Sequence, residues 1–135
     1  MMFVWLIALL IAVPVAAQDV IDRPIPFGPH RRALSLDYIH RHYDPGARDI
    51  TIVPRIIVIH WTGAGSLASA FATFRPDELP PQRRDIQRGG TLNVSAHFLV
   101  DRDGTVYRLM PETWLARHTI GLNRIALGIE NIGGP

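Results

Sequence analysis

The sequence predicts an α/β fold in which helices lie against a β-sheet. Three observations favour this class: apolar strand-like runs at residues 56–60 and 125–132, a β-hairpin pattern at 94–110, and a helical pattern at 66–75. The chain has 135 residues, of which 47% are hydrophobic, and this is enough for one domain with its own core. The absence of cysteine excludes a disulfide-stabilised scaffold, and the apolar content excludes a disordered chain.

The charge balance excludes no enzyme class but gives no sign of a nucleic-acid partner. All 14 basic side chains are arginines, and 12 acidic side chains leave a net charge of +2. A charge this small does not indicate binding to a polyanion, so no nucleic-acid partner is expected.

Residues 1–17 resemble a signal peptide. They carry no charged side chain, residues 3–13 are apolar, and the small residues Val15, Ala16 and Ala17 precede Gln18 as a signal-peptidase site requires. The alternative is an uncleaved anchor, but the run is shorter than the ~20 residues that span a bilayer. We therefore expect cleavage, a periplasmic or secreted protein, and no stable membrane anchor afterwards.

Residues 18–54 form a proline-rich lead-in, and the domain proper is expected over 55–135. Within the lead-in, one short helix is predicted at residues 36–43, where Leu36, Ile39 and Tyr43 share a helical face. The unbroken β-branched run at 56–60 then predicts a strand buried on both faces, ending at His60.

A helix follows this strand. Ser66 is a suitable N-cap, Leu67, Ala70, Phe71 and Phe74 have helical spacing, and Arg75–Pro76 ends the pattern. Residues 76–90 are predicted to be a solvated loop.

The rest of the chain reads as three strands. Residues 94–100 and 105–110 flank an Asp-Gly turn at 101–104 and form the predicted hairpin, and a last strand runs over 125–132.

Two polar residues in apolar strands are not explained by packing. Glu130 shares a strand face with Ala126, Gly128 and Ile132, where a carboxylate must be paired, lie near a metal, or act as an acid or base with a raised pKa. His60 ends a core strand, where ligands bind in α/β sheets, although a hydrogen-bonded core histidine is an equal alternative.

Two further histidines leave the choice of role open. For His97, in the first hairpin strand, a structural role is favoured, and for His118 a substrate contact and a surface position both stay open.

Six short motifs in order resemble the zinc-dependent N-acetylmuramoyl-L-alanine amidases, which share a fold with phage lysozyme-type amidases and peptidoglycan recognition proteins. The motifs are Val58-Ile59-His60-Trp61-Thr62, residues 94–104, Leu109-Met110-Pro111-Glu112, Ala116-Arg117-His118, Leu122-Asn123 and Leu127-Gly128-Ile129-Glu130-Asn131. An ordered set is far more specific than any single motif.

The resemblance implies a mixed central β-sheet flanked by helices, and hydrolysis of the amide between N-acetylmuramic acid and L-alanine by a zinc-activated water. It implies that His60 is a zinc ligand and Glu130 the catalytic acid/base, and that His118 and Asn123 line the substrate groove. The expected cofactor is Zn²⁺, and the expected partners are peptidoglycan or muropeptides. Residues 55–135 then correspond to the N-terminal part of an amidase domain.

The motifs that match the family include only one of its zinc ligands. A catalytic zinc site uses three protein ligands and an open position, and the family takes its other two ligands from a segment after the Gly-Ile-Glu strand. We therefore expect the remaining ligands beyond Pro135 and a chain that is truncated, lacks the C-terminal part of the fold and is inactive alone. Two alternatives stay open: a non-catalytic peptidoglycan-binding module, and a three-histidine site of His60, His97 and His118.

Overall fold

The computed structural model describes residues 18–63 and 65–134. The predicted signal peptide at residues 1–17 lies outside these ranges. Eight elements follow one another within the described residues: β1 (Val20–Asp22), α1 (Pro29–His42), β2 (Ile56–Trp61), α2 (Leu67–Phe74), α3 (Arg84–Gln87), β3 (Phe98–Val100), β4 (Val106–Arg108) and β5 (Ala126–Asn131).

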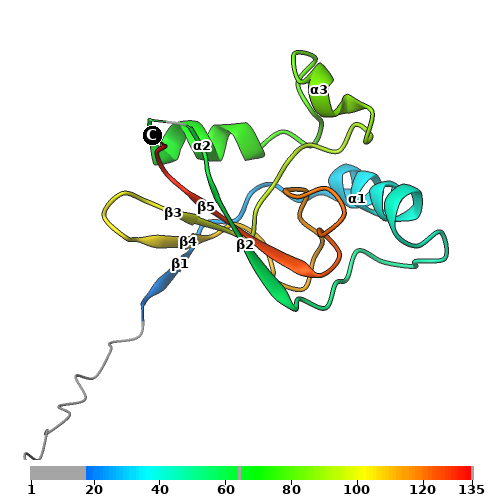
Figure 1. The fold of residues 1–135 in the computed structure, drawn as a ribbon, viewed down its shortest axis with the longest axis horizontal. Helices are drawn as coiled ribbons and strands as arrows, with labels where there is room; N and C mark the ends of the chain where they lie inside the picture. Colours follow the sequence, from blue (N-terminus) through cyan, green and yellow to red (C-terminus); the bar gives the residue numbers. More distant parts are fainter. Residues whose placement is uncertain (1–17, 64, 135) are drawn as a thin grey trace, which may run out of the picture.

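The described strands form one mixed sheet in the order β1-β4-β3-β5-β2 (Figure 1). Only β3 and β4 pair antiparallel, while β1 with β4, β3 with β5, and β5 with β2 pair parallel. The predicted α/β class with a mixed central sheet and flanking helices is confirmed. The register places His60 of β2 beside Glu130 of β5, so the two residues that the sequence singled out are neighbours on the sheet.

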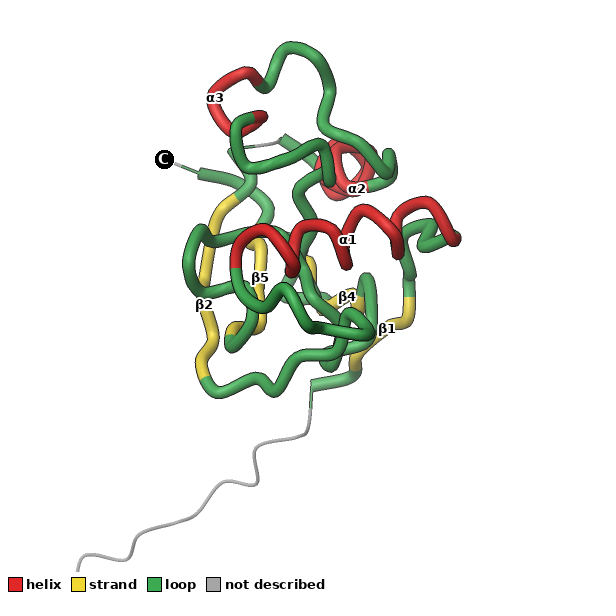
Figure 2. Tube along the Cα trace, turned by 90° about the vertical axis from the view of Figure 1, so that its right-hand side faces the viewer, coloured by secondary structure: helices red, strands yellow, loops and turns green. Residues whose placement is uncertain are grey.

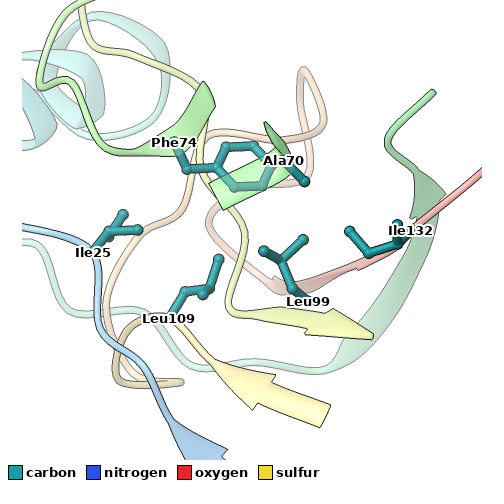
Figure 3. Close-up of a cluster of buried hydrophobic side chains, with 6 residues drawn as sticks. All are labelled: Ile25, Ala70, Phe74, Leu99, Leu109 and Ile132. Carbon is teal, nitrogen blue, oxygen red and sulfur yellow. The ribbon is translucent and has the colours of Figure 1, made fainter. Parts of the chain in front are cut away.

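Helix α2 lies over one face of the sheet, and the main core is between them (Figures 1 and 3). Ala70 and Phe74 point from α2 toward Leu99 and Leu109 on the hairpin and toward Ile132 after β5, and all five side chains are buried. Ser66 caps the helix, because its hydroxyl accepts a hydrogen bond from the Ser69 amide at 3.2 Å. The predicted helix and its cap are therefore confirmed.

The proline-rich lead-in is more ordered than the sequence predicted. Helix α1 begins at Pro29, seven residues before the predicted start, because proline suits the first turn of a helix. It lies at one side of the sheet (Figure 2) and packs Tyr38 and Ile39 against Ile50 and Leu115 in a second core. Strand β1, which the sequence did not predict, pairs with β4, so residues 18–54 belong to the same folded unit.

The prediction that β2 is buried on both faces is wrong. β2 lies at an edge of the sheet, and Ile57, Ile59 and Trp61 are 59%, 72% and 66% exposed. A β-branched run shows that a strand forms but not how many of its faces are covered. Among the described residues, the face opposite α2 carries no helix.

The hairpin is confirmed, although its strands are shorter than predicted. Asp101 and Gly104 form the turn, in which the Gly104 amide donates to the Asp101 carbonyl at 3.0 Å. The predicted loop at 76–90 contains the short helix α3.

Within residues 18–63 and 65–134, no helix has the length and apolar character needed to cross a membrane.

Candidate functional site

His60 and His118 meet at the C-terminal end of β2. The His60 Nε2 atom lies 3.1 Å from the His118 Nδ1 atom, and the hydroxyl of Thr119 lies within 3.1 Å of both nitrogens. Burial is the main cause that lowers the pKa of His118 to about 4, and the neighbouring His97 and His60 lower it further. Both imidazoles are therefore neutral at physiological pH, since burial also lowers the pKa of His60.

His118 is held in place by two residues on different segments. The Asn123 side-chain carbonyl accepts hydrogen bonds from the His118 and Thr119 amides at 2.9 and 2.7 Å, and its amide group donates to the Tyr38 hydroxyl. On the other side, the imidazole lies directly over Gly128 of β5, where a Cβ atom would come within 2.7 Å of the ring. Only glycine leaves room for His118 at this position on the strand.

His97 has the structural role that the sequence favoured. It is fully buried, and its ring bridges the Gly128 amide at 3.0 Å and the Trp114 carbonyl at 2.9 Å. Both ring nitrogens are thus occupied by backbone groups, and neither is free to bind a ligand.

Glu130 faces a pocket between α2 and the sheet. This pocket, the Glu130 pocket, is also lined by Thr62, Thr73, Ser95, Arg117 and His118. Burial raises the pKa of the Glu130 carboxyl to about 7 from its ordinary value of 4.5. The carboxyl group can therefore gain and lose a proton near neutral pH.

A buried arginine forms the wall of this pocket. Arg117 is 5% exposed, and its guanidinium donates hydrogen bonds to the carbonyls of Ile86, Gly90 and Leu92. It also lies over the Tyr38 ring, 5.0 Å from the ring centre. Arg117 thus ties the segment that carries α3 to the body of the domain.

The sequence model of the N-acetylmuramoyl-L-alanine amidases matches residues 50–135, which is more than half of the chain. The chain belongs to this family. No curated protein is a detectable relative of it.

Solved structures of amidases and of peptidoglycan recognition proteins are similar to the chain. The amidase LysC from Clostridium intestinale URNW is 20% identical with a TM-score of 0.47, over 87% of this chain and 61% of its own. A mutant endolysin from Bacillus subtilis is 22% identical with a TM-score of 0.49, over 86% and 62%. Bumblebee PGRP-SA is 20% identical with a TM-score of 0.48, over 87% and 62%. The chain thus spans about three fifths of the length of these structures.

In this amidase-family chain, some of the residues predicted from the sequence line the Glu130 pocket, and others contact or support a residue that lines it. His118 and Glu130 line the Glu130 pocket, and His60 contacts His118 from β2. Asn123 is fully buried and shapes the turn beneath His118. Thr119, Gly128 and Arg117 were not identified as site residues, because the contacts that make them important cross from one segment to another.

The described residues do not fit the zinc site that the resemblance implied. Within the described ranges, no three side chains of His, Cys, Asp or Glu come together as a metal site would require. His60 and His118 are adjacent, but the nearby His97 is held by backbone groups. The three-histidine alternative is therefore not supported by the geometry.

The raised pKa of Glu130 predicts a pH-dependent stability that the Glu130→Gln variant lacks. Well below pH 4.5 the carboxyl is protonated in both the folded and the unfolded chain. As pH rises from 4.5 to 7, the unfolded chain ionises first and the free energy of unfolding falls. The fall is less than about 3 kcal/mol, because solvent screens the half-exposed carboxyl. Urea unfolding of both proteins at pH 4.5 and 8 measures this, because all other titrating groups cancel in the difference. A difference between the two proteins that stays constant with pH would contradict the raised pKa.

Proposed function

We propose that the chain is the Glu130-bearing part of a peptidoglycan amidase that hydrolyses the amide between N-acetylmuramic acid and L-alanine. Membership of the amidase family supports the substrate class. The observation that carries the catalytic part is the half-buried Glu130 carboxyl, which lines a pocket together with His118 and has its pKa raised to about 7 by burial. Binding alone does not require a buried carboxyl group of this kind.

Glu130 supplies the proton transfers of the proposed reaction. At neutral pH the carboxylate form accepts a proton from the attacking water, and the resulting acid donates it to the leaving amine of L-alanine. His118, held neutral, adds no positive charge that would lower the pKa of the carboxyl again. The test uses the protein extended beyond Pro135 by the segment expected to supply the remaining zinc ligands, called here the full-length protein. Its incubation with a muropeptide, followed by detection of a new L-alanine N-terminus, tests the reaction.

Zinc dependence is part of the same proposal and rests on the resemblance to the zinc-dependent amidases, whose family model matches residues 50–135. In this chain His60 would be one ligand, and a zinc ion held there would polarise the scissile carbonyl. The described residues do not supply three ligands, so this part of the proposal is independent of the role given to Glu130.

A non-catalytic peptidoglycan-binding module is the second candidate. The observation that favours it is that the described residues bring no three side chains of His, Cys, Asp or Glu together, as a zinc site requires. Zinc content and hydrolysis distinguish the two candidates, because a binding module shows neither while it still binds muropeptides.

We expect residues 18–135 to bind zinc only weakly and to show no amidase activity. Two adjacent imidazoles compete poorly with water and buffer, since the affinity of a metal site comes from several ligands held together by the fold. Zinc per chain after dialysis measures this, with His30→Ala as a control at an exposed histidine. One tightly bound zinc that disappears on His97→Ala or His118→Ala would instead support the three-histidine site.

The periplasmic or secreted location stays a prediction. It rests on residues 1–17, which lie outside the described ranges. A peptidoglycan substrate is consistent with such a location.

A further inference from the structure

A second pocket adjoins the Glu130 pocket. The two share Arg83, Val94, Arg117 and His118 as walls, so they lie side by side, and together they are called here the depression. The second pocket, called here the Arg83 pocket, has a volume of about 330 Å³ and extends past Thr119 toward Tyr38 of α1. It is large enough for the part of a substrate that lies next to the reacting bond.

The charged side chains that line the Arg83 pocket are cationic. Its lining contains two arginines, Arg83 and Arg117, and no aspartate or glutamate among the described residues. Arg117 is almost fully buried, and within the described part of the chain no carboxylate lies in ion-pair distance of it. Burial lowers the pKa of Arg117, Tyr38 raises it, and the positive charge of Arg83 makes a smaller contribution that lowers it. An anion bound between them would relieve this repulsion.

Arg83 is available to bind such an anion. Its guanidinium contacts the Asp85 carboxylate two residues along the chain, at 3.2 and 3.3 Å. Both side chains are largely exposed, at 43% and 61%. An exposed ion pair of this kind contributes little to stability, so a carboxylate in the pocket can replace Asp85 without a large cost.

We propose that the Arg83 pocket binds a carboxylate of the stem peptide, and that Arg83 is the residue that selects it. This inference rests on the proposed function, and it adds the orientation in which the substrate lies across the two pockets. The sugar side of the scissile amide carries no charge, whereas the peptide side carries carboxylates. The peptide therefore lies toward α3, and the sugar lies at the other end of the Glu130 pocket.

The guanidinium group of Arg83 is well suited to bind a carboxylate. The planar guanidinium presents two parallel N–H groups that match the two oxygens of a carboxylate. Arg117 cannot take this role, because it already donates to three backbone carbonyls. It supplies a fixed positive charge behind the ligand, while Arg83 makes the direct contact.

Two soluble probes test the proposal. The first is N-acetylmuramoyl-L-alanyl-D-glutamate, and the second is the same molecule with both glutamate carboxyls converted to amides. Binding is measured by calorimetry in the full-length protein with Glu130→Gln, which prevents turnover of the probes. We expect the acid to bind about tenfold or more tightly than the diamide.

Two substitutions identify the residue that makes the distinction. Arg83→Gln should abolish the preference for the acid and leave binding of the diamide unchanged. Arg84→Gln removes the same charge from the next residue, which is exposed and lines neither pocket, and should keep the preference. Circular dichroism confirms that each variant is folded.

The outcomes separate the two levels of the proposal. Equal binding of the acid and the diamide, or a preference that survives Arg83→Gln, overturns the carboxylate assignment and leaves the proposed function intact. If the folded protein binds neither probe, the proposed function fails and the assignment fails with it.

Discussion

Replacing Glu130 with glutamine should lower kcat on a muropeptide by about 10²-fold or more in the full-length protein. Glutamine has the shape of glutamate but cannot accept the proton of the attacking water. The substitution removes a half-buried carboxyl whose pKa is raised to about 7, so it should preserve or increase the stability of the fold. Release of L-alanyl peptides, measured at several substrate concentrations, separates kcat from KM.

The pH profile adds a second check on Glu130. The activity of the unmodified protein should rise as pH passes about 7, because the carboxylate form is the base. Glu78→Gln is the matched control: Glu78 is exposed, forms an ion pair with His30 and lines neither the Glu130 pocket nor the Arg83 pocket, so turnover should not change. Unchanged turnover in the Glu130→Gln protein would remove Glu130 from the mechanism.

Replacing Gly128 with alanine should cost about 1–3 kcal/mol of stability and most of the activity. The added Cβ would lie 2.7 to 2.9 Å from three atoms of the His118 ring, closer than real contacts allow. The ring has little freedom to move away, because Asn123 fixes the His118 backbone and His60 lies beside the ring. The strand is held as well, since both the amide and the carbonyl of Gly128 bond to His97.

Urea unfolding and the NMR signals of the His118 ring measure the effect of Gly128→Ala. Gly65→Ala is the control, since a Cβ at that exposed glycine would meet nothing within 4 Å. If the His118 signals are the same in Gly128→Ala as in the unmodified protein, the close contact does not position this histidine.

Local sequence patterns were sufficient to predict α2 and the β-hairpin. The Ser66 cap and the spacing of Ala70 and Phe74 predicted α2, and the Asp-Gly turn predicted the hairpin. Strand β1 could not be predicted, because three residues with prolines nearby become a strand only by pairing with β4, more than 80 residues away. The exposure of β2 depends on its place at the edge of the sheet, which its own residues do not determine.

In the candidate site, too, the sequence predicted the local features but not the contacts between distant segments. Strand parity identified Glu130, since the alternation of faces along β5 is a local property. The contact between His60 and His118 joins residues 58 positions apart, and no periodicity predicts it. Nothing in the sequence around Gly128 indicates that the His118 imidazole packs against it.

The attachment of the α3 segment through Arg117 has a consequence for the shape of the depression. The segment is held by a guanidinium whose hydrogen bonds go to backbone carbonyls, and Gly89 lets it approach closely, since a Cβ there would lie 2.9 Å from Arg117. A guanidinium keeps its proton at every pH at which the protein is folded. The wall of the depression is therefore fixed by a charge that does not titrate, while the group inside it does. Protonation of Glu130 therefore changes the charge inside the depression and leaves the charge of this wall unchanged.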